Sequence, residues 1–257
     1  MKEFSTNQER TAEYLKKFNR DKVLQGLVKD RSPVIFDVGA NDGSSIVEFK
    51  ELWPEANVHS FEPQEECWEK LEERASYFKN SVFINRNGVG AKRIDAMTFY
   101  THNITTGQSG FHRVNVDSND SIRLRDLSNS AESRSSYQAS LNQTRMVPVI
   151  TLADYLTENE IPKIHLLKID TQGHEPEVLC GLGENLTNVD VVLTEIMLYD
   201  FYERSLSFSD VEQYLLPAGF RLYDISHISK NPMNGRTDWV DAIYVNQSIL
   251  HGGLFTL

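Results

Sequence analysis

One segment, residues 34–46, restricts the fold more than any other. It reads VIFDVGANDGSSI: a run of β-branched and aromatic residues typical of a buried strand, followed by Gly39 and Gly43. A helical pattern then continues as far as Pro54. A glycine turn between a strand and a helix lets a ligand approach the main chain, and the helix start offers free N–H groups. The segment predicts an α/β fold with a ligand site at this turn.

The alternation of strand and helix continues along the chain. Two more strands and two helices complete a βαβαβ half of a doubly wound sheet, and a second half resumes after an interruption. The strands are predicted at residues 34–38, 57–63, 81–90, 163–170 and 189–196, with a closing antiparallel pair at 220–226 and 241–246. The pattern therefore predicts one α/β domain built on a mostly parallel sheet.

The first 32 residues precede this pattern. Tyr14, Leu15 and Phe18 recur at helical spacing there, which predicts an N-terminal extension of one or two amphipathic helices packed on the main domain. We place the main domain at residues 33–250.

The interruption, residues 95–150, is predicted to be an insertion. Two extra strands, RIDAMTFYTH and TRMVPVITLADYL, are expected to form a hairpin. Between them lies a serine-rich segment, residues 115–143, with few apolar residues. It is either a surface loop or a lid over a substrate, since long loops in compact domains are often functional.

Composition excludes several classes of partner. The net charge of −11 argues against a nucleic-acid partner, which requires a basic face. No apolar run approaches the roughly 18 residues of a membrane span, and no signal peptide is recognisable at the N-terminus. Only two cysteines occur, which favours a reducing, cytoplasmic location. The sequence leaves the oligomeric state open, with a homodimer among the options.

The residues around the first turn indicate the kind of ligand. Neither GxGxxG nor GK[ST] is present, so the turn is typical of neither a dinucleotide nor a P-loop site. Asp37 and Asp42 instead favour a cationic or zwitterionic ligand such as S-adenosylmethionine. Glu62, at the end of the second strand, is placed to accept both hydroxyls of a ribose. The turn at Gly88 and Val89 either supports an adenine or is a plain turn.

The segment LLKIDTQGHE supplies the candidates for chemistry. Asp170 ends a buried strand, at the edge of the sheet where ligands bind in such folds. His174 is either a general base or a packed residue at a helix start, and Asp170 is the second candidate base. Lys168 either pairs with a carboxylate or contacts substrate, and Glu195 is expected at the same cleft. A divalent metal held by Asp170, His174 and Glu195 is an alternative activator.

The insertion offers two further candidates. Gln108 and His112 lie in its first part, and they either line the pocket for the acceptor or are incidental residues of a surface loop.

Several motifs in colinear order resemble the FkbM-type methyltransferases. They extend from Pro33 to Asn246 and read FDVGANDG, FEP, NGVG, TLADYL, LLKIDTQGHEPEVLCG and DAIYVN. The resemblance implies a Rossmann-like class I methyltransferase fold, with seven strands of which the last is antiparallel. It also implies methyl transfer from S-adenosylmethionine to a hydroxyl of a sugar, glycan or small natural product.

The resemblance also assigns site residues. It implies cofactor contacts at Asp37, Gly39, Asn41, Gly43 and Glu62. Asp170 and His174 would lie near the transferred methyl group. Where the family commonly has an acid, this chain has Gln172. Two alternatives remain at this point: a nicotinamide-dependent oxidoreductase of the same general fold, and a non-catalytic module that binds the cofactor.

Overall fold

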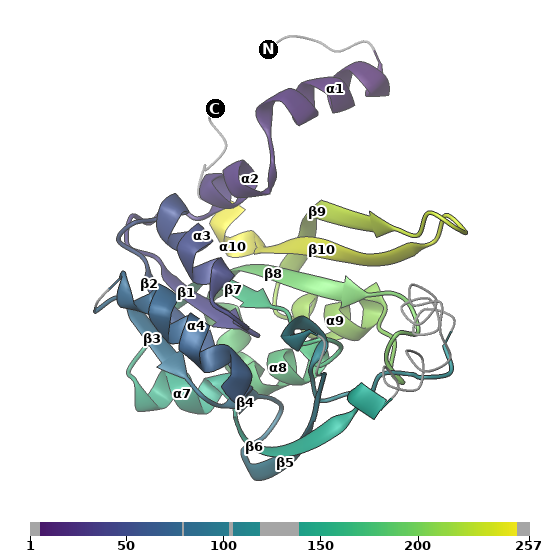
Figure 1. Ribbon diagram of the computed structural model, residues 1–257. Helices are drawn as coiled ribbons and strands as arrows, with labels where there is room; N and C mark the ends of the chain where they lie inside the picture. Colours follow the sequence, from purple (N-terminus) through teal and green to yellow (C-terminus); the bar gives the residue numbers. More distant parts are fainter. Residues whose placement is uncertain (1–5, 79, 103–104, 119–138, 251–257) are drawn as a thin grey trace.

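The computed structural model describes residues 6–78, 80–102, 105–118 and 139–250. These residues form a seven-stranded sheet covered by helices on both faces, and a smaller three-stranded sheet beside it (Figure 1). The main sheet contains, in spatial order, β3 (Val82–Asn85), β2 (Asn57–Phe61), β1 (Val34–Val38), β7 (Ile164–Ile169), β8 (Val189–Met197), β10 (Thr237–Asn246) and β9 (Phe220–Lys230).

The direction of the strands confirms the predicted fold class. β1, β2, β3, β7 and β8 pair in parallel, whereas β10 runs antiparallel to both β8 and β9. The chain winds outward from β1 to β3 and then crosses back to β7, which lies on the other side of β1. The strand order therefore reverses between β1 and β7, which is where open α/β sheets bind ligands.

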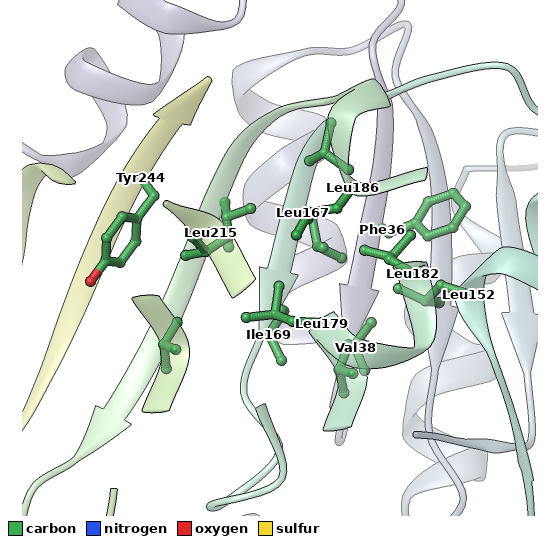
Figure 2. Packing of buried hydrophobic residues seen from close by; sticks show 14 of the residues in the cluster. Phe36, Val38, Leu152, Leu167, Ile169, Leu179, Leu182, Leu186, Leu215 and Tyr244 are labelled. Carbon is green, nitrogen blue, oxygen red and sulfur yellow. The ribbon is translucent and has the colours of Figure 1, made fainter. Parts of the chain in front are cut away.

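Two apolar layers hold the helices to the sheet. Phe36 and Val38 of β1 and Leu167 and Ile169 of β7 contribute to one layer, which also contains the α8 leucines (Figure 2). Ile35 and Leu166 belong to the opposite layer. Because both faces are covered, the strands are apolar almost throughout, as expected of a parallel sheet.

The helices divide between these layers. On the first face lie α7 (Leu152–Glu158), α8 (Glu175–Leu182), the 3-10 helix η2 (Gly183–Asn188) and α9 (Phe208–Leu215). On the second lie α2 (Arg20–Leu27), α3 (Ser44–Leu52), α4 (Glu65–Ser76) and α10 (Gln247–Leu250). No helix within the described ranges combines the length and apolarity that a bilayer crossing requires.

The insertion forms most of the smaller sheet. β5 (Ile94–Thr101) and β6 (Gln143–Ile150) pair antiparallel, which confirms the predicted hairpin. The short strand β4 (Gly88–Val89) pairs with β6 in parallel. The helix η1 (Thr106–Gln108) follows β5. Most of the serine-rich segment, residues 119–138, lies outside the described residues, so its predicted role is not addressed by the structure.

Two details differ from the predicted elements. Residues 81–90 do not form one strand: β3 belongs to the main sheet and β4 to the smaller one. The predicted strand through TLADYL ends at Ile150, and α7 follows because the Thr151 side chain caps its start. At the start of α9, Ser207 is the cap and Asp210 completes a capping box.

The N-terminal helices differ in how they pack. The helix α2 buries Val23, Leu24 and Leu27 in the second apolar layer, as predicted. The helix α1 (Asn7–Lys17) buries no residue, and it projects away from the body in Figure 1. It contacts the domain through a hydrogen bond from the Tyr14 hydroxyl to Asp224. The prediction that this region packs on the domain is therefore wrong for α1.

We expect α1 and α2 to contribute differently to the free energy of unfolding. Removing residues 1–17 should change the free energy of unfolding by less than about 1 kcal/mol, because α1 buries no residue and Tyr14 reaches the domain through an exposed hydrogen bond. Leu24→Ala should cost about 2–5 kcal/mol, since Leu24 is fully buried. Urea unfolding of the truncated and the substituted protein measures both quantities. A truncation as damaging as Leu24→Ala would contradict the assignment of α1.

Candidate functional site

A cavity lies at the carboxyl ends of β1, β2 and β7. Its place is the point where the strand order reverses, which is where ligands bind in open α/β sheets. The main sheet and its loops contribute Val38, Gly39, Asn41, Phe61, Glu62, Pro63, Gln64, Asp170, Thr171 and Gln172. The segment before β4, the smaller sheet, and the part of the insertion that begins at η1 contribute Asn87, Gly88, Val89, Phe99, Thr106, Gly107, Ser109, Gly110 and Phe111.

The glycine turn after β1 lies against the segment that follows β7. A Cβ atom at Gly39 would be 1.9 Å from the backbone oxygen of Asp170, and the φ of Gly39 is +84°. The N–H groups of Gly39 and Ala40 both donate to the carbonyl of Phe61. Only glycine fits this position, because the contact is with backbone that cannot rotate away. The turn therefore brings Asp170 to the floor of the cavity.

Gly43, the second glycine of the motif, has a different role. It precedes α3 with a φ of +80°, and a Cβ there would be 2.9 Å from the Leu71 side chain of α4. It is not among the cavity residues. The glycine allows α3 to pack closely on α4, and the cofactor contact expected at Gly43 stays a prediction.

Glu62 connects the end of β2 to the glycine turn. Its Oε2 accepts the Asn41 N–H at 2.8 Å, and its Oε1 accepts the Gln64 N–H at 2.8 Å. Burial raises the pKa of Glu62 to about 7, against the opposing effect of these two bonds. A carboxylate has about four lone-pair sites, so roughly two remain for a ligand in the cavity.

Asp37 and Lys168 form an ion pair beneath the turn. They are register partners on β1 and β7, and Lys168 Nζ lies 3.1 Å from Asp37 Oδ1 and 3.6 Å from Asp170 Oδ2. Burial lowers the pKa of Lys168, but the two carboxylates outweigh it and the net shift is upward. Neither Asp37 nor Lys168 lines the cavity. The expected substrate contact at Lys168 is replaced by pairing with carboxylates, the other option that the sequence left open.

Gln172 joins two acids across the same edge of the sheet. Its Nε2 donates to Asp170 Oδ1 at 2.9 Å and to Glu195 Oε2 at 3.0 Å, and its Oε1 accepts from the buried Tyr202 hydroxyl at 2.7 Å. Burial, followed by the charge of Asp170, raises the pKa of Glu195. Glu195 therefore reaches the cavity through Gln172 rather than lining it.

Glu175 holds the loop that carries Asp170 and Gln172. Its carboxylate accepts the N–H groups of Thr171 at 2.8 Å and Gly173 at 3.0 Å. The side chain is almost fully buried, which raises its pKa to about 7. Sequence reasoning missed this role, although an acid in the first turn of a helix after a glycine is a recognisable capping signal.

The insertion forms the remaining wall. The Thr106 hydroxyl donates to Asn41 Oδ1 at 2.8 Å, which attaches η1 to the glycine turn. Phe99 and Phe111 pack edge to face, and a Cβ at Gly88 would lie 2.4 Å from the Phe111 ring. Sequence reasoning did not identify Thr106 as a cavity residue, because nothing local to it indicates a contact with Asn41.

His174 and His112 lie beside this wall rather than in it. The His174 ring packs on the Phe111 ring with centroids 4.6 Å apart, and burial lowers the pKa of His174 to about 4. His112 contacts His174, and neither lines the cavity. The Gln108 side chain is not part of the lining either, although its carbonyl lies 2.9 Å from the Tyr202 hydroxyl.

The metal set suggested by the sequence is not assembled. Within the described part of the chain, the group of possible ligands brought together is His112, His174 and Glu177, not Asp170, His174 and Glu195. Of the residues predicted for the site, the cavity is lined by Gly39, Asn41, Glu62, Gly88, Val89 and Asp170.

Comparison with known proteins gives a family match over most of the chain. The methyltransferase FkbM domain matches residues 37–222. The chain is 27% identical over 188 residues to the 2-O-methyltransferase NoeI of Sinorhizobium fredii, covering 71% of each chain. It is 31% identical over 157 residues to the 31-O-demethyl-FK506 methyltransferase FkbM of Streptomyces tacrolimicus, covering 59% of this chain and 60% of that protein.

Other similarities are more distant. The hexuronic acid methyltransferase AglP of Haloferax volcanii is 25% identical over 167 residues, which cover 65% of this chain and 57% of that protein. Among solved structures, the precorrin-6y C5,15-methyltransferase of Geobacter metallireducens superimposes with a TM-score of 0.43 at 10% identity, covering 88% of this chain and 86% of that one.

The contact at Gly39 generates a prediction. Gly39→Ala should destabilise the protein by about 2–5 kcal/mol, because the methyl group meets the Asp170 carbonyl and the backbone is left-handed. The control is Gly26→Ala in α2, where a Cβ meets nothing within 4 Å and alanine favours the helix. Urea unfolding compares the two variants, and equal stabilities would contradict the close contact.

Proposed function

The chain belongs to the FkbM methyltransferase family, and we propose that it transfers the methyl group of S-adenosylmethionine to a hydroxyl of a sugar, glycan or small natural product. The observation that carries the proposal is the cavity between the Gly39 turn, Glu62 and Asp170, at the reversal point of a methyltransferase-type sheet.

The family match confirms the resemblance found in the motifs, and it favours methyl transfer over the nicotinamide alternative. The structure adds a physical argument. A pyrophosphate favours a turn free of negative charge, whereas acids surround this one: Asp37 beneath it, Glu62 beside it and Asp170 opposite. Such surroundings fit a ligand that carries an ammonium and a sulfonium group.

The cavity residues suggest how the cofactor is held. Glu62 keeps about two lone pairs for the ribose hydroxyls after accepting the Asn41 and Gln64 N–H groups. Gly88 and Val89, with Phe99 nearby, offer an apolar surface for the adenine. The Gly39 turn then remains to bind the methionine part of S-adenosylmethionine. Asp37 Oδ2 lies buried beneath the turn and accepts no hydrogen bond within the described residues.

Asp170 is the residue we propose to orient and deprotonate the acceptor hydroxyl. It lines the cavity, and its side chain is 37% exposed, whereas His174 lies beside the wall. Gln172 Nε2 holds Oδ1, and Lys168 lies near Oδ2, so the carboxylate is fixed in one orientation. Bound S-adenosylmethionine supplies an electrophilic methyl carbon, and alignment with the hydroxyl accounts for up to about 7–11 kcal/mol of the barrier.

The proposed class of acceptor is inferred from the names of the relatives. Their names describe a 2-O-methyltransferase, a hexuronic acid methyltransferase and a 31-O-demethyl-FK506 methyltransferase. The insertion from Thr106 to Phe111 and the Gln172 loop are the parts of the wall left for the acceptor. The proposed acceptor is therefore a small polyhydroxylated molecule, and the particular hydroxyl is left open.

The experiment that tests the function has two stages. Isothermal titration should detect binding of S-adenosylmethionine and of S-adenosylhomocysteine, and should detect none of NAD. Mass spectrometry should then find methylated products when the protein is incubated with a panel of hexuronic acids, oligosaccharides and macrolides. Binding of NAD in place of the adenosyl ligands would refute the proposal. Tight cofactor binding without transfer to any acceptor would favour the non-catalytic module.

Glu62 should make cofactor binding depend on pH. Only the ionised carboxyl group of Glu62 can accept hydrogen bonds from both ribose hydroxyls, and its pKa in the free protein is about 7. The Kd of S-adenosylhomocysteine should therefore rise as pH falls below 7, by up to about tenfold per pH unit. Titration calorimetry between pH 8 and pH 6 measures this dependence. In Glu62→Gln the slope should vanish, and affinity at pH 8 should be about 10- to 100-fold weaker. A pH-independent wild-type Kd would exclude this role.

Asp170→Asn separates catalysis from binding. It should lower kcat by about 10²- to 10⁴-fold, since a positioned base contributes that much, while the Kd of S-adenosylhomocysteine changes only a few-fold. The matched control is Asp154→Asn, an acid on α7 that pairs with Arg93 and does not line the cavity. Single-turnover transfer rates check the prediction. An unchanged rate in Asp170→Asn would remove this residue from the chemistry.

A further inference from the structure

A second cluster of side chains lies beside the cavity wall and takes no part in the proposed transfer. His112 follows Phe111 in the insertion, whereas His174 and Glu177 belong to the start of α8. His174 Nδ1 is 3.3 Å from His112 Nε2 and 3.5 Å from Glu177 Oε2. The three groups therefore converge on one point, although 62 residues separate the two histidines.

These distances match those between ligands of one metal ion. Tetrahedral zinc has bonds of about 2.0–2.2 Å to imidazole nitrogen and carboxylate oxygen, which places ligand atoms about 3.3–3.5 Å apart. The three ligand atoms in the structure all lie within 4.8 Å of one another. Two imidazoles and a carboxylate form a donor set that zinc uses in proteins, and the nitrogen ligands disfavour magnesium and calcium.

The surroundings of the cluster supply a second observation. Glu177 Oε2 is buried and has no hydrogen-bond partner within the described residues, although such atoms are normally paired. The other oxygen, Oε1, accepts from Arg204 Nη1 at 2.7 Å, which orients the carboxylate. Arg204 Nη1 also lies 3.4 Å from His112 Nε2, so the guanidinium is the competing cation at this site.

We propose that His112, His174 and Glu177 bind one divalent transition-metal ion of the zinc class, with a water molecule as the fourth ligand. In this site Arg204 stays on Glu177 Oε1 and orients a ligand, as outer partners do in metal sites.

The position of the site indicates its effect. His112 is adjacent to Phe111, which lines the cavity, and His174 packs on the Phe111 ring. An ion here would join the insertion to α8 and fix the wall next to the acceptor. The role inferred for the ion is to hold this wall in place, and the inference is independent of the methyl transfer proposed above.

Metal content tests the site directly. The full chain is purified without a polyhistidine tag, made metal-free with a chelator, mixed with Zn²⁺ and desalted, and its zinc is measured by mass spectrometry. We expect one zinc ion per chain in the wild type, and a loss of zinc in His112→Gln and Glu177→Gln. The matched control is His227→Gln, which removes an exposed histidine of β9 and should retain the ion.

Thermal unfolding of the metal-free wild type gives a second measurement that needs no variant to fold. Zn²⁺ should raise its Tm by several degrees, because an ion that binds the folded state stabilises it, whereas Mg²⁺ should not. Absence of zinc uptake by the wild type would show that Arg204 alone completes the cluster, and would overturn the proposal. Equal zinc content in the wild type and both ligand variants would overturn it as well.

Discussion

The contact between the Gly39 turn and the Asp170 backbone is the constraint on which the site depends. Strands β1 and β7 are neighbours that separate only after Val38 and Ile169, where the Asp170 N–H still donates to the Val38 carbonyl. Because residue 39 has no side chain, the loop after β1 and the loop after β7 remain in contact where they leave the sheet. Asp170 therefore faces the turn that is proposed to hold the cofactor, and its position is set by backbone rather than by flexible side chains.

A balance of charge across the same edge follows from this arrangement. Asp37, Asp170 and Glu195 lie on three adjacent strands or their ends, and Lys168 neutralises part of their charge. Gln172 adds no charge, but its amide donates hydrogen bonds to Asp170 and Glu195 together. A carboxylate at this position would face Asp170 and Glu195 without an N–H to donate to them, and like charges this close repel.

The sequence predicted best what depends on local pattern. β1 was predicted at its observed bounds, because a buried parallel strand is apolar on both faces and ends at a glycine turn. Glu62 was also predicted to reach the cavity, since the carboxyl ends of neighbouring parallel strands share one edge. Gly43 and His174 could not be assigned in this way. Their surroundings depend on Leu71 of α4 and on Phe111 of the insertion, and no periodicity encodes such packing.

The insertion contacts both the glycine turn after β1 and the opposite wall of the cavity. Thr106 donates to Asn41 of the turn that is proposed to hold the cofactor, and five residues later Phe111 forms the wall on the acceptor side. Only four residues separate Thr106 from Phe111. Under the proposed function, we therefore expect a change that reshapes the acceptor side at Phe111 to disturb the hydrogen bond at Asn41, and acceptor choice to be coupled to cofactor affinity. A fixed anchor next to Phe111 would limit that coupling.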